Sequence, residues 1–477
     1  MKRDEVMMRP RSGHKSDIMG TDSVWRLLFR FSGPAIIAMM AAASYHIVDT
    51  IFIGHIPGAG KESLAAMTIS QPIMLIFIAL ESGTGMGAAS LIARKLGAGR
   101  PDEANRVLSI AMTLTIVLGG LMTAICLPLL NPILRGFGAT ETILPLATSY
   151  ISILVIFAAV ESYFMVMATI VRAEGSPLFS SVVSIITALF NIILDPIFIY
   201  GWGPAPEMGI AGAATATIIA RSIGALLFVY YFVSGRSSAH FKWRYFLPKL
   251  SIVKEIYRVG IASMVRMGGW SILMIFVNRK AISYGETTLA ILGVINRANS
   301  VARMPSFGIS QGMMPLVGYN YGAGKMDRVG EVFSKATRAA LAWGSVCVMV
   351  MLLFPEQILS IFNSEDDFLR DGIPAIRIFS VAYLTMGPYF NSSAFFQAIG
   401  RGWNSLMIGV AREFFFILPL IYLLTLFWGA TGIWVTFPIA DVLAIILAMV
   451  WVVTKSRKLG IHFHLRYPKK TTTNPFE

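Results

Sequence analysis

The sequence predicts an all-α membrane protein with twelve transmembrane helices. Of its 477 residues, 55% are hydrophobic and only 14% are charged, with a mean hydropathy of +0.67, whereas soluble domains carry about 25% charged residues. The apolar residues form runs of about 20, the length that crosses a bilayer. The net charge of +14 is spread over short loops between these runs. This spread is typical of membrane topology, so we expect the lipid bilayer as partner and no nucleic acid.

The apolar segments follow one another with short polar connections. They cover residues 27–54, 64–93, 107–130, 143–170, 178–200, 209–233, 255–284, 288–318, 332–354, 372–397, 404–427 and 429–454. The basic stretch before the first segment lacks the apolar region and cleavage site of a signal peptide. Cys126 and Cys347 lie inside apolar runs, so we expect neither a disulfide nor a metal site from them.

Basic residues are concentrated in every second loop. The loops after the second, fourth, sixth, eighth and tenth segments hold most of them, including Arg172, whereas the other side holds only Lys61, Arg135 and Arg370. Positively charged loops stay in the cytoplasm. An even number of spans therefore predicts a multi-pass protein of the plasma (inner) membrane with both termini cytoplasmic.

The two halves of the chain resemble each other. Residues 83–107, GTGMGAASLIARKLGAGRPDEANRV, correspond to residues 308–332, GISQGMMPLVGYNYGAGKMDRVGEV. Several glycines and one aspartate keep the same spacing: Gly83, Gly87, Gly97, Gly99 and Asp102 correspond to Gly308, Gly312, Gly322, Gly324 and Asp327. Because each half has six segments, the two copies share one orientation and are related by an axis along the membrane normal.

This repeat sets the predicted domains. They are a cytoplasmic N-terminal tail (1–26), an N-terminal lobe (27–233), a cytoplasmic linker (234–254), a C-terminal lobe (255–454) and a cytoplasmic C-terminal tail (455–477). Two bundles that flank one cavity can rock to open it to either side in turn, which is how secondary transporters work.

Charged residues inside the apolar segments need a reason, because each costs a few kcal/mol there. Asp49 lies deep in the first segment, in SYHIVDTIFIGH. Asn191 and Asp195, in FNIILDPIFIY, are four residues apart and share one helix face. With a hydroxyl from the sixth segment, Thr215 or Thr217, they would form an oxygen cluster suited to Na⁺ or a shared proton.

This cluster has no counterpart in the second half. By the repeat, Asp49 falls near Val277 and Asn278, and Asp195 falls at Leu420. The sequence therefore predicts that cation coupling resides in the N-terminal half.

Other intramembrane charges are candidates for a substrate cavity. Glu81 and Glu161 could attract cationic substrates or pair with an arginine. Arg266 and Arg303 could pair with acids or receive an anionic group. We expect a structural role for Arg412 and Glu413. The sequence does not assign a role to Asp441.

Catalytic patterns are not found. The sequence has no Ser-His-Asp arrangement and no His/Cys metal set, and the GAG[RK]xxD loops at 97–102 and 322–327 are typical of helix caps. They lack the Lys-Ser/Thr pair of a phosphate-binding loop. We expect no enzyme activity and no cofactor other than a coupling ion.

Taken together, these motifs resemble the multidrug and toxic compound extrusion (MATE) family. VDTIFIGH, GMGAASLIARKLGAGR, RAEGSP and NIILDPIFIY occur in the order and spacing of that family over nearly the whole chain. The resemblance implies a V-shaped, two-lobed transporter that exports drugs against a Na⁺ or H⁺ gradient.

The resemblance also implies a cation site in the N-terminal lobe. In one prokaryotic branch it is formed by the residues that match Asp49, Asn191, Asp195 and Thr217. If the coupling ion is Na⁺, the first three would be metal ligands. A second branch uses acids on helices seven, eight and ten, which this sequence lacks there.

Two functions remain open. The first is an antiporter that exports cationic amphiphilic small molecules in exchange for H⁺ or Na⁺, working as a monomer. The alternative is a transporter or flippase of an organic anion, peptide or lipid-linked cargo, for which Arg266 and Arg303 are the support. A channel would need a filter-like loop, and none stands out.

Overall fold

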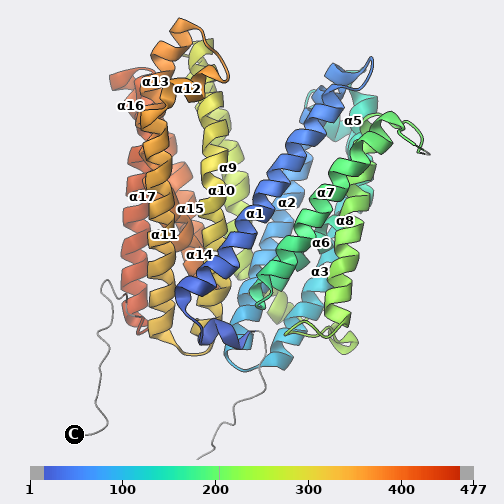
Figure 1. Cartoon of the computed structure of the whole chain (residues 1–477), viewed down its shortest axis with the longest axis vertical. Helices are drawn as coiled ribbons and strands as arrows, with labels where there is room; N and C mark the ends of the chain where they lie inside the picture. The colour runs from blue at the N-terminus through green and yellow to red at the C-terminus, as the bar shows by residue number, and fades with distance from the viewer. Residues whose placement is uncertain (1–15, 204, 462, 464–477) are drawn as a thin grey trace, which may run out of the picture.

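The computed structural model describes residues 16–203, 205–461 and 463. The outer parts of the two predicted tails lie outside these residues. The described residues contain helices and no strand. The helices form two arms that meet at one end and diverge toward the other, giving a V (Figure 1).

The first arm contains the N-terminal half of the chain (Figure 1). After a short 3₁₀ helix, η1 (Asp17–Gly20), its helices are α1 (Val24–Gly54), α2 (Gly60–Gly97), α3 (Pro101–Cys126), α4 (Leu130–Gly136), α5 (Leu144–Ile156), α6 (Ala158–Ala173), α7 (Pro177–Tyr200) and α8 (Ile210–Val233).

The second arm contains the C-terminal half, which follows a linker with the 3₁₀ turn η2 (Trp243–Tyr245). Its helices are α9 (Leu250–Ile282), α10 (Glu286–Gly322), α11 (Met326–Leu353), α12 (Pro355–Ser360), α13 (Asp366–Ser380), α14 (Ala382–Ala398), α15 (Gly402–Val410), the π-helical segment η3 (Ala411–Ile417), α16 (Leu418–Trp428) and α17 (Thr431–Lys458).

The predicted twelve-helix, two-lobed architecture is confirmed. Within the described residues, nine helical stretches are long and apolar enough to cross a membrane, and the bent pair α5–α6 makes a tenth. The remaining two spans are α10 and the pair α13–α14, which are richer in polar residues. Buried Asn391 and Gln397 of α14 are examples. Their polar groups face neighbouring helices rather than lipid.

Two spans are less regular than the sequence predicts. The fourth is broken at Phe157, where α5 and α6 meet at an angle of 57°. The eleventh contains the π-helical segment η3 between α15 and α16. Segments of this kind are rare and frequently lie at functional sites.

Three pairs of repeated glycines lie where the two arms touch: Gly83 and Gly308, Gly87 and Gly312, and Gly97 and Gly322. Helix α2 packs against α9, and by the same symmetry α10 packs against α1. A Cβ atom on Gly87 would lie 2.1 Å from the carbonyl oxygen of Ile256, and one on Gly312 would lie 2.3 Å from Ser32 Oγ. The glycines of the repeat therefore permit close packing of backbone on backbone between the lobes.

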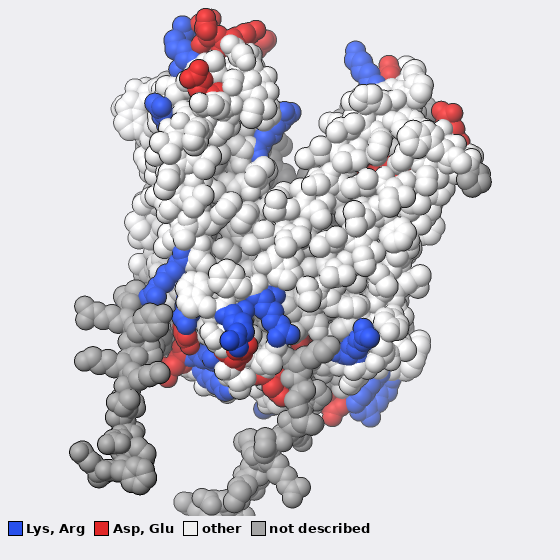
Figure 2. Space-filling model, viewed as in Figure 1, with Lys and Arg blue, Asp and Glu red and all other residues white. Residues whose placement is uncertain are grey.

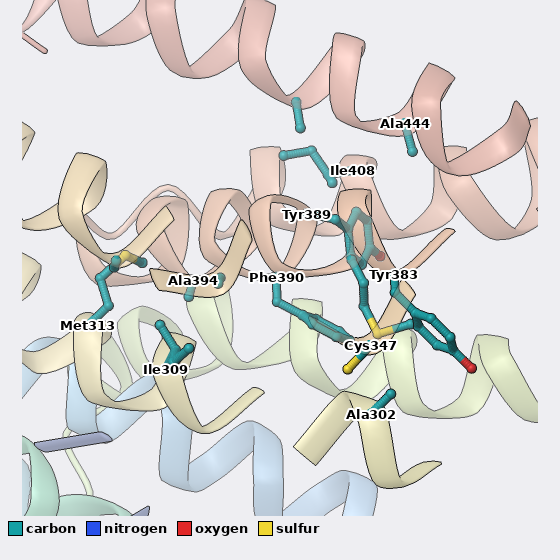
Figure 3. Packing of buried hydrophobic residues seen from close by; sticks show 14 of the residues in the cluster. Ala302, Ile309, Met313, Cys347, Tyr383, Tyr389, Phe390, Ala394, Ile408 and Ala444 are labelled. Carbon is teal, nitrogen blue, oxygen red and sulfur yellow. The ribbon is translucent and has the colours of Figure 1, made fainter. Parts of the chain in front are cut away.

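Each lobe also has its own apolar packing. In the C-terminal lobe the core lies between α10, α14 and their neighbours, and Figure 3 shows Ile309 and Met313 of α10 beside Phe390 and Ala394 of α14. These interiors hold each arm together as a unit.

Charged side chains gather at the ends of the molecule, and the side surface in between is largely uncharged (Figure 2). The end where the arms meet carries many of the lysines and arginines, and we call it the basic end. The molecule is hollowed between the arms at the opposite end (Figure 2). An uncharged belt between two charged ends is what a bilayer requires.

Candidate functional site

The residues predicted to bind a cation come together between α1, α7 and α8. Asn191 donates its side-chain amide to Asp195 Oδ1 at 3.2 Å and lies 3.3 Å from Thr217 Oγ1. The i, i+4 spacing on α7 produces the first contact, and the packing of α7 against α8 produces the second. Asp49 reaches the same region from α1, which packs along α7, and it interacts electrostatically with Asp195.

These side chains are buried. Asp49 is 4% exposed, Asn191 2% and Asp195 0%. Within the described part of the chain, Asp49 Oδ1, Asn191 Oδ1 and Asp195 Oδ2 have no hydrogen-bond partner. Buried polar atoms are almost always paired, so such oxygens call for an ion, a proton or water. Two carboxylates with an amide and a hydroxyl oxygen fit a hard cation such as Na⁺, or a proton shared between the carboxyl groups.

The same donor set does not fit a transition metal. No group of three or more His, Cys, Asp or Glu side chains suited to a metal occurs among the described residues. Borderline and soft metals prefer imidazole and thiolate ligands. The cluster therefore suits Na⁺ or a proton.

The oxygen cluster borders a cavity of about 310 Å³ in the N-terminal lobe. Asn191 and Thr217 line one part of its wall, and Glu81 and Arg221 line another. The cavity also reaches Phe307 and Gln311 of α10, so both lobes contribute to it. A substitution of Asn191 or Thr217 would therefore alter both the oxygen cluster and the wall of the cavity.

A second polar network lies on the same cavity. Glu161 pairs with Arg221 at 3.1 Å, and Arg221 donates to the Tyr45 hydroxyl at 2.8 Å. Glu81 accepts a hydrogen bond from Ser162 Oγ at 2.9 Å. From the sequence, each glutamate could either face a substrate cavity or pair with an arginine. Glu161 pairs with Arg221, and Glu81 lines the cavity.

Two arginines of this cavity, Arg172 and Arg221, are not among the site residues predicted from the sequence. Arg221 lies in the apolar run TIIARSIGALL of α8, where the rule applied to Asp49 would have found it. Arg172, which the charge pattern placed in a loop, belongs to the last turn of α6 and lines the cavity. Its guanidinium donates to Ser180 Oγ at 3.2 Å and Thr169 Oγ1 at 3.1 Å. The helix extends further than its apolar segment, which explains the difference.

The sequence profile of the MatE family matches residues 34–197 and 262–423, one stretch in each lobe. The chain belongs to the MATE family. It is therefore a multi-pass membrane transporter built on two repeats.

Relatives and solved structures agree with this MATE assignment over almost the full length. The multidrug export protein MepA of Staphylococcus haemolyticus is 25% identical over 439 residues, which are 92% of this chain and 95% of that protein. A crystal structure of MATE in the bent conformation superposes with a TM-score of 0.88 at 28% identity, covering 94% and 99% of the two chains.

A third match is a transporter of the MOP superfamily from Pyrococcus furiosus. It is described as having a binding pocket of reverse polarity that suggests a different function. The TM-score is 0.86 at 28% identity, with 94% of this chain and 99% of that chain covered.

The C-terminal lobe of this MATE chain holds a different set of charges. Arg412 pairs with Asp441 at 2.6 Å, and both side chains are nearly buried. Arg266 donates to Ser393 Oγ at 2.8 Å. Arg303 lies over the rings of Trp270 and Phe390.

Glu413, the next residue after Arg412, is buried and lines the same pocket as Arg266, Arg303 and Arg412.

Proposed function

We propose that this MATE transporter is a secondary antiporter that exports cationic amphiphilic drugs in exchange for H⁺ or Na⁺. The observation that carries the proposal is the pair Asp49 and Asp195, because Asp49 Oδ1 and Asp195 Oδ2 are buried and have no hydrogen-bond partner among the described residues. A buried carboxylate needs a cation, a proton or a donor, because an uncompensated charge is costly in this surrounding.

The geometry suggests how the ion and the drug are coupled. Asn191 touches Asp195 on one side and lines the cavity on the other. When an ion or proton occupies the carboxylates, the cavity loses negative charge, and a cationic molecule is held less well. If the two ligands favour different lobe arrangements, each drives the other out.

The charge distribution supports one orientation in the membrane. The basic end carries loops such as 94–106 and 325–338 and would face the cytoplasm. Both termini would then be cytoplasmic. The arms diverge at the opposite end, so this conformation would be open to the outside of the plasma (inner) membrane (Figure 1). A single chain contains the cavity and the cluster, and we propose that the monomer is the working unit.

The MepA relatives support the choice of cargo. They are multidrug export proteins that match 89% or more of this chain. A cavity of about 310 Å³, lined by apolar side chains and a few polar ones, suits varied amphiphilic molecules.

Ethidium efflux from everted membrane vesicles tests the proposal, with a pH gradient and a Na⁺ gradient imposed separately. We expect one gradient to drive export by the wild type and Asp49→Asn to abolish it. Asp371→Asn, at an exposed side chain, removes the same charge elsewhere and should export normally. Full gradient-driven export by Asp49→Asn would refute the coupling role of this carboxylate.

Two threonines of α8 provide a finer test. Thr217 Oγ1 lies 3.3 Å from the Asn191 amide, whereas Thr215 Oγ1 donates to the Ala211 carbonyl of its own helix at 2.9 Å. A single hydrogen bond contributes about 1 kcal/mol. Thr217→Ala should therefore raise the ion concentration for half-maximal export about five-fold, and Thr215→Ala should not. Equal behaviour of the two variants would remove Thr217 from the site.

The second candidate is export or flipping of an anionic, peptide or lipid-linked cargo. Arg266 and Arg303 in the membrane interior favour it, as does the reverse-polarity pocket described for the Pyrococcus furiosus neighbour. Wild-type vesicles that move no cationic dye under either gradient would favour this candidate.

A further inference from the structure

The C-terminal lobe contains a small pocket that the coupling scheme does not use. Four elements converge on it: α9, α10, α14 and the π-helical segment η3. Three arginines face it from three of them, and Trp270, Tyr389 and Phe390 complete much of its wall. The arginines are Arg266, Arg303 and Arg412. We call this group the arginine pocket.

The charges of the arginine pocket do not balance. Asp441 forms an ion pair with Arg412 at 2.6 Å. Glu413 is the other carboxylate of the group, so three guanidinium groups meet two carboxylates among the described residues. Arg266 has a neutral partner, Ser393. An arginine cannot shed its proton to escape this excess, so one positive charge remains for an anion to neutralise.

Arg303 is the available cation. Within the described part of the chain it has no hydrogen bond or ion pair, and its guanidinium carbon lies 5.1 Å from the Trp270 ring centre and 5.5 Å from that of Phe390. Contact with ring faces leaves the N–H edges of a guanidinium free to bind a planar anion such as a carboxylate. The same rings offer faces for an aromatic group to pack against.

The pocket and the main cavity are linked by shared wall residues. Phe307 and Gln311 line both the 310 Å³ cavity and a small neighbouring space. Arg266 and Phe390 line both that space and the arginine pocket. The arginine pocket itself has a volume of about 30 Å³, room for one small polar group rather than a whole drug.

We propose that the arginine pocket is an anion-binding subsite that takes the carboxylate of an aromatic cargo whose body lies in the main cavity. The preferred cargo is then an aromatic zwitterion, with its positive group toward the carboxylates of the N-terminal lobe and its carboxylate toward Arg303. This inference rests on the proposed export function, and it narrows the class of molecule exported.

Two dyes that differ by one group test the inference. Rhodamine 110 carries a carboxylate, and rhodamine 123 is its methyl ester. Fluorescence anisotropy with the purified full-length protein gives the Kd of each dye. We expect the wild type to bind rhodamine 110 more tightly than rhodamine 123. The Arg303→Gln substitution should raise the Kd of rhodamine 110 by a factor at least ten times larger than that for rhodamine 123.

Two further variants serve as controls. Arg297→Gln removes the same charge from the same helix at an exposed position over Phe362, and it should change neither Kd. Arg303→Lys keeps the charge and should retain part of the preference. Equal Kd values of the two dyes for the wild type would overturn the inference, as would equal weakening of both by Arg303→Gln.

This test is separate from the test of export. If rhodamine 110 binds through Arg303 but no gradient drives either dye across vesicles, the export function fails and the subsite stands. If rhodamine 123 is exported and the carboxylate gives no advantage in binding, the export function stands and the subsite fails.

Discussion

The two lobes share one backbone arrangement and carry opposite charge in the membrane interior. In the N-terminal lobe, Asp49 and Asp195 lie without a basic partner within hydrogen-bond reach among the described residues. In the C-terminal lobe, the excess charge is that of Arg303. By contrast, three pairs of repeated glycines, such as Gly97 and Gly322, make equivalent inter-lobe contacts in both copies. The repeat has preserved contacts made by backbone atoms, whereas the side chains of the two interiors have diverged.

This difference explains how one scaffold can hold two kinds of site. A close helix contact depends on the absence of a side chain, which both copies can satisfy with glycine. A site depends on the side chains present, and Asp195 corresponds to Leu420 by the repeat. The lobes can therefore rock as similar bodies while each presents its own chemistry to the cavity.

The largest effect should come from the buried ion pair that each lobe contains, Glu161–Arg221 in one and Arg412–Asp441 in the other. Removing one partner leaves a buried charge without compensation, which costs about 3–5 kcal/mol. We expect Arg221→Gln and Arg412→Gln each to lower the free energy of unfolding by this amount, measured by denaturant unfolding in detergent.

The double variants separate charge from shape. Glu161→Gln/Arg221→Gln and Arg412→Gln/Asp441→Asn remove both charges, so each should lose less stability than the single arginine variant of the same lobe. The surface pair Arg370–Asp367 has both side chains mostly exposed. Removing one of its charges should change the free energy of unfolding by less than about 1 kcal/mol. Single variants no less stable than the doubles would mean that neither pair stabilises its lobe.

The next effect concerns Glu174, which has no acidic counterpart in the second half, where Ile399 stands. Glu174 lies in the turn between α6 and α7 and accepts hydrogen bonds from Ser237 Oγ at 2.6 Å and the Ala239 amide at 3.2 Å. It thereby anchors the linker between the lobes. Burial raises the pKa of this carboxyl from 4.5 to about 7, against the opposing effect of these hydrogen bonds.

A raised pKa means that the folded protein holds this proton more tightly than the unfolded chain. The stability due to Glu174 is therefore complete below about pH 4.5 and is lost as the pH rises through about 7. The Glu174→Gln variant cannot ionise at this position. Its free energy of unfolding, relative to that of the wild type, should therefore increase by about 3 kcal/mol between pH 4 and pH 9. Denaturant unfolding of both proteins across this range measures the difference, and parallel pH profiles would contradict it.

The sequence predicted the fold and the N-terminal cluster better than the second lobe. Apolar runs, loop charges and the glycine register are local signals, and they gave the helix count and the repeat. Asn191 and Asp195 share a helix face by spacing alone, so their contact was predictable. The pairing of Arg221 with Glu161 was not, because it joins two helices whose relative rotation depends on packing. The π-helical segment that brings Arg412 and Glu413 to the arginine pocket has no sequence signature either.

The smallest effect should come from the contacts that the lobes share. A Cβ atom on Gly97 would lie 1.9 Å from the Tyr319 carbonyl oxygen, and one on Gly322 would lie 2.0 Å from that of Arg94. In both cases the added carbon would meet backbone atoms across the contact between α2 and α10, which cannot move aside without shifting a helix. Gly97→Ala and Gly322→Ala should each cost about 1–3 kcal/mol through overpacking.

Gly120→Ala is the matched control, because nothing lies within 4 Å of the added carbon. There, alanine should be neutral or stabilising by up to about 1 kcal/mol, since it favours the helix. If the repeat is a true symmetry of the inter-lobe contact, Gly97→Ala and Gly322→Ala should lose similar stability in denaturant unfolding. A cost at only one of them would mean that the two copies no longer share the contact, and the difference between the lobes would extend from their charges to their backbone.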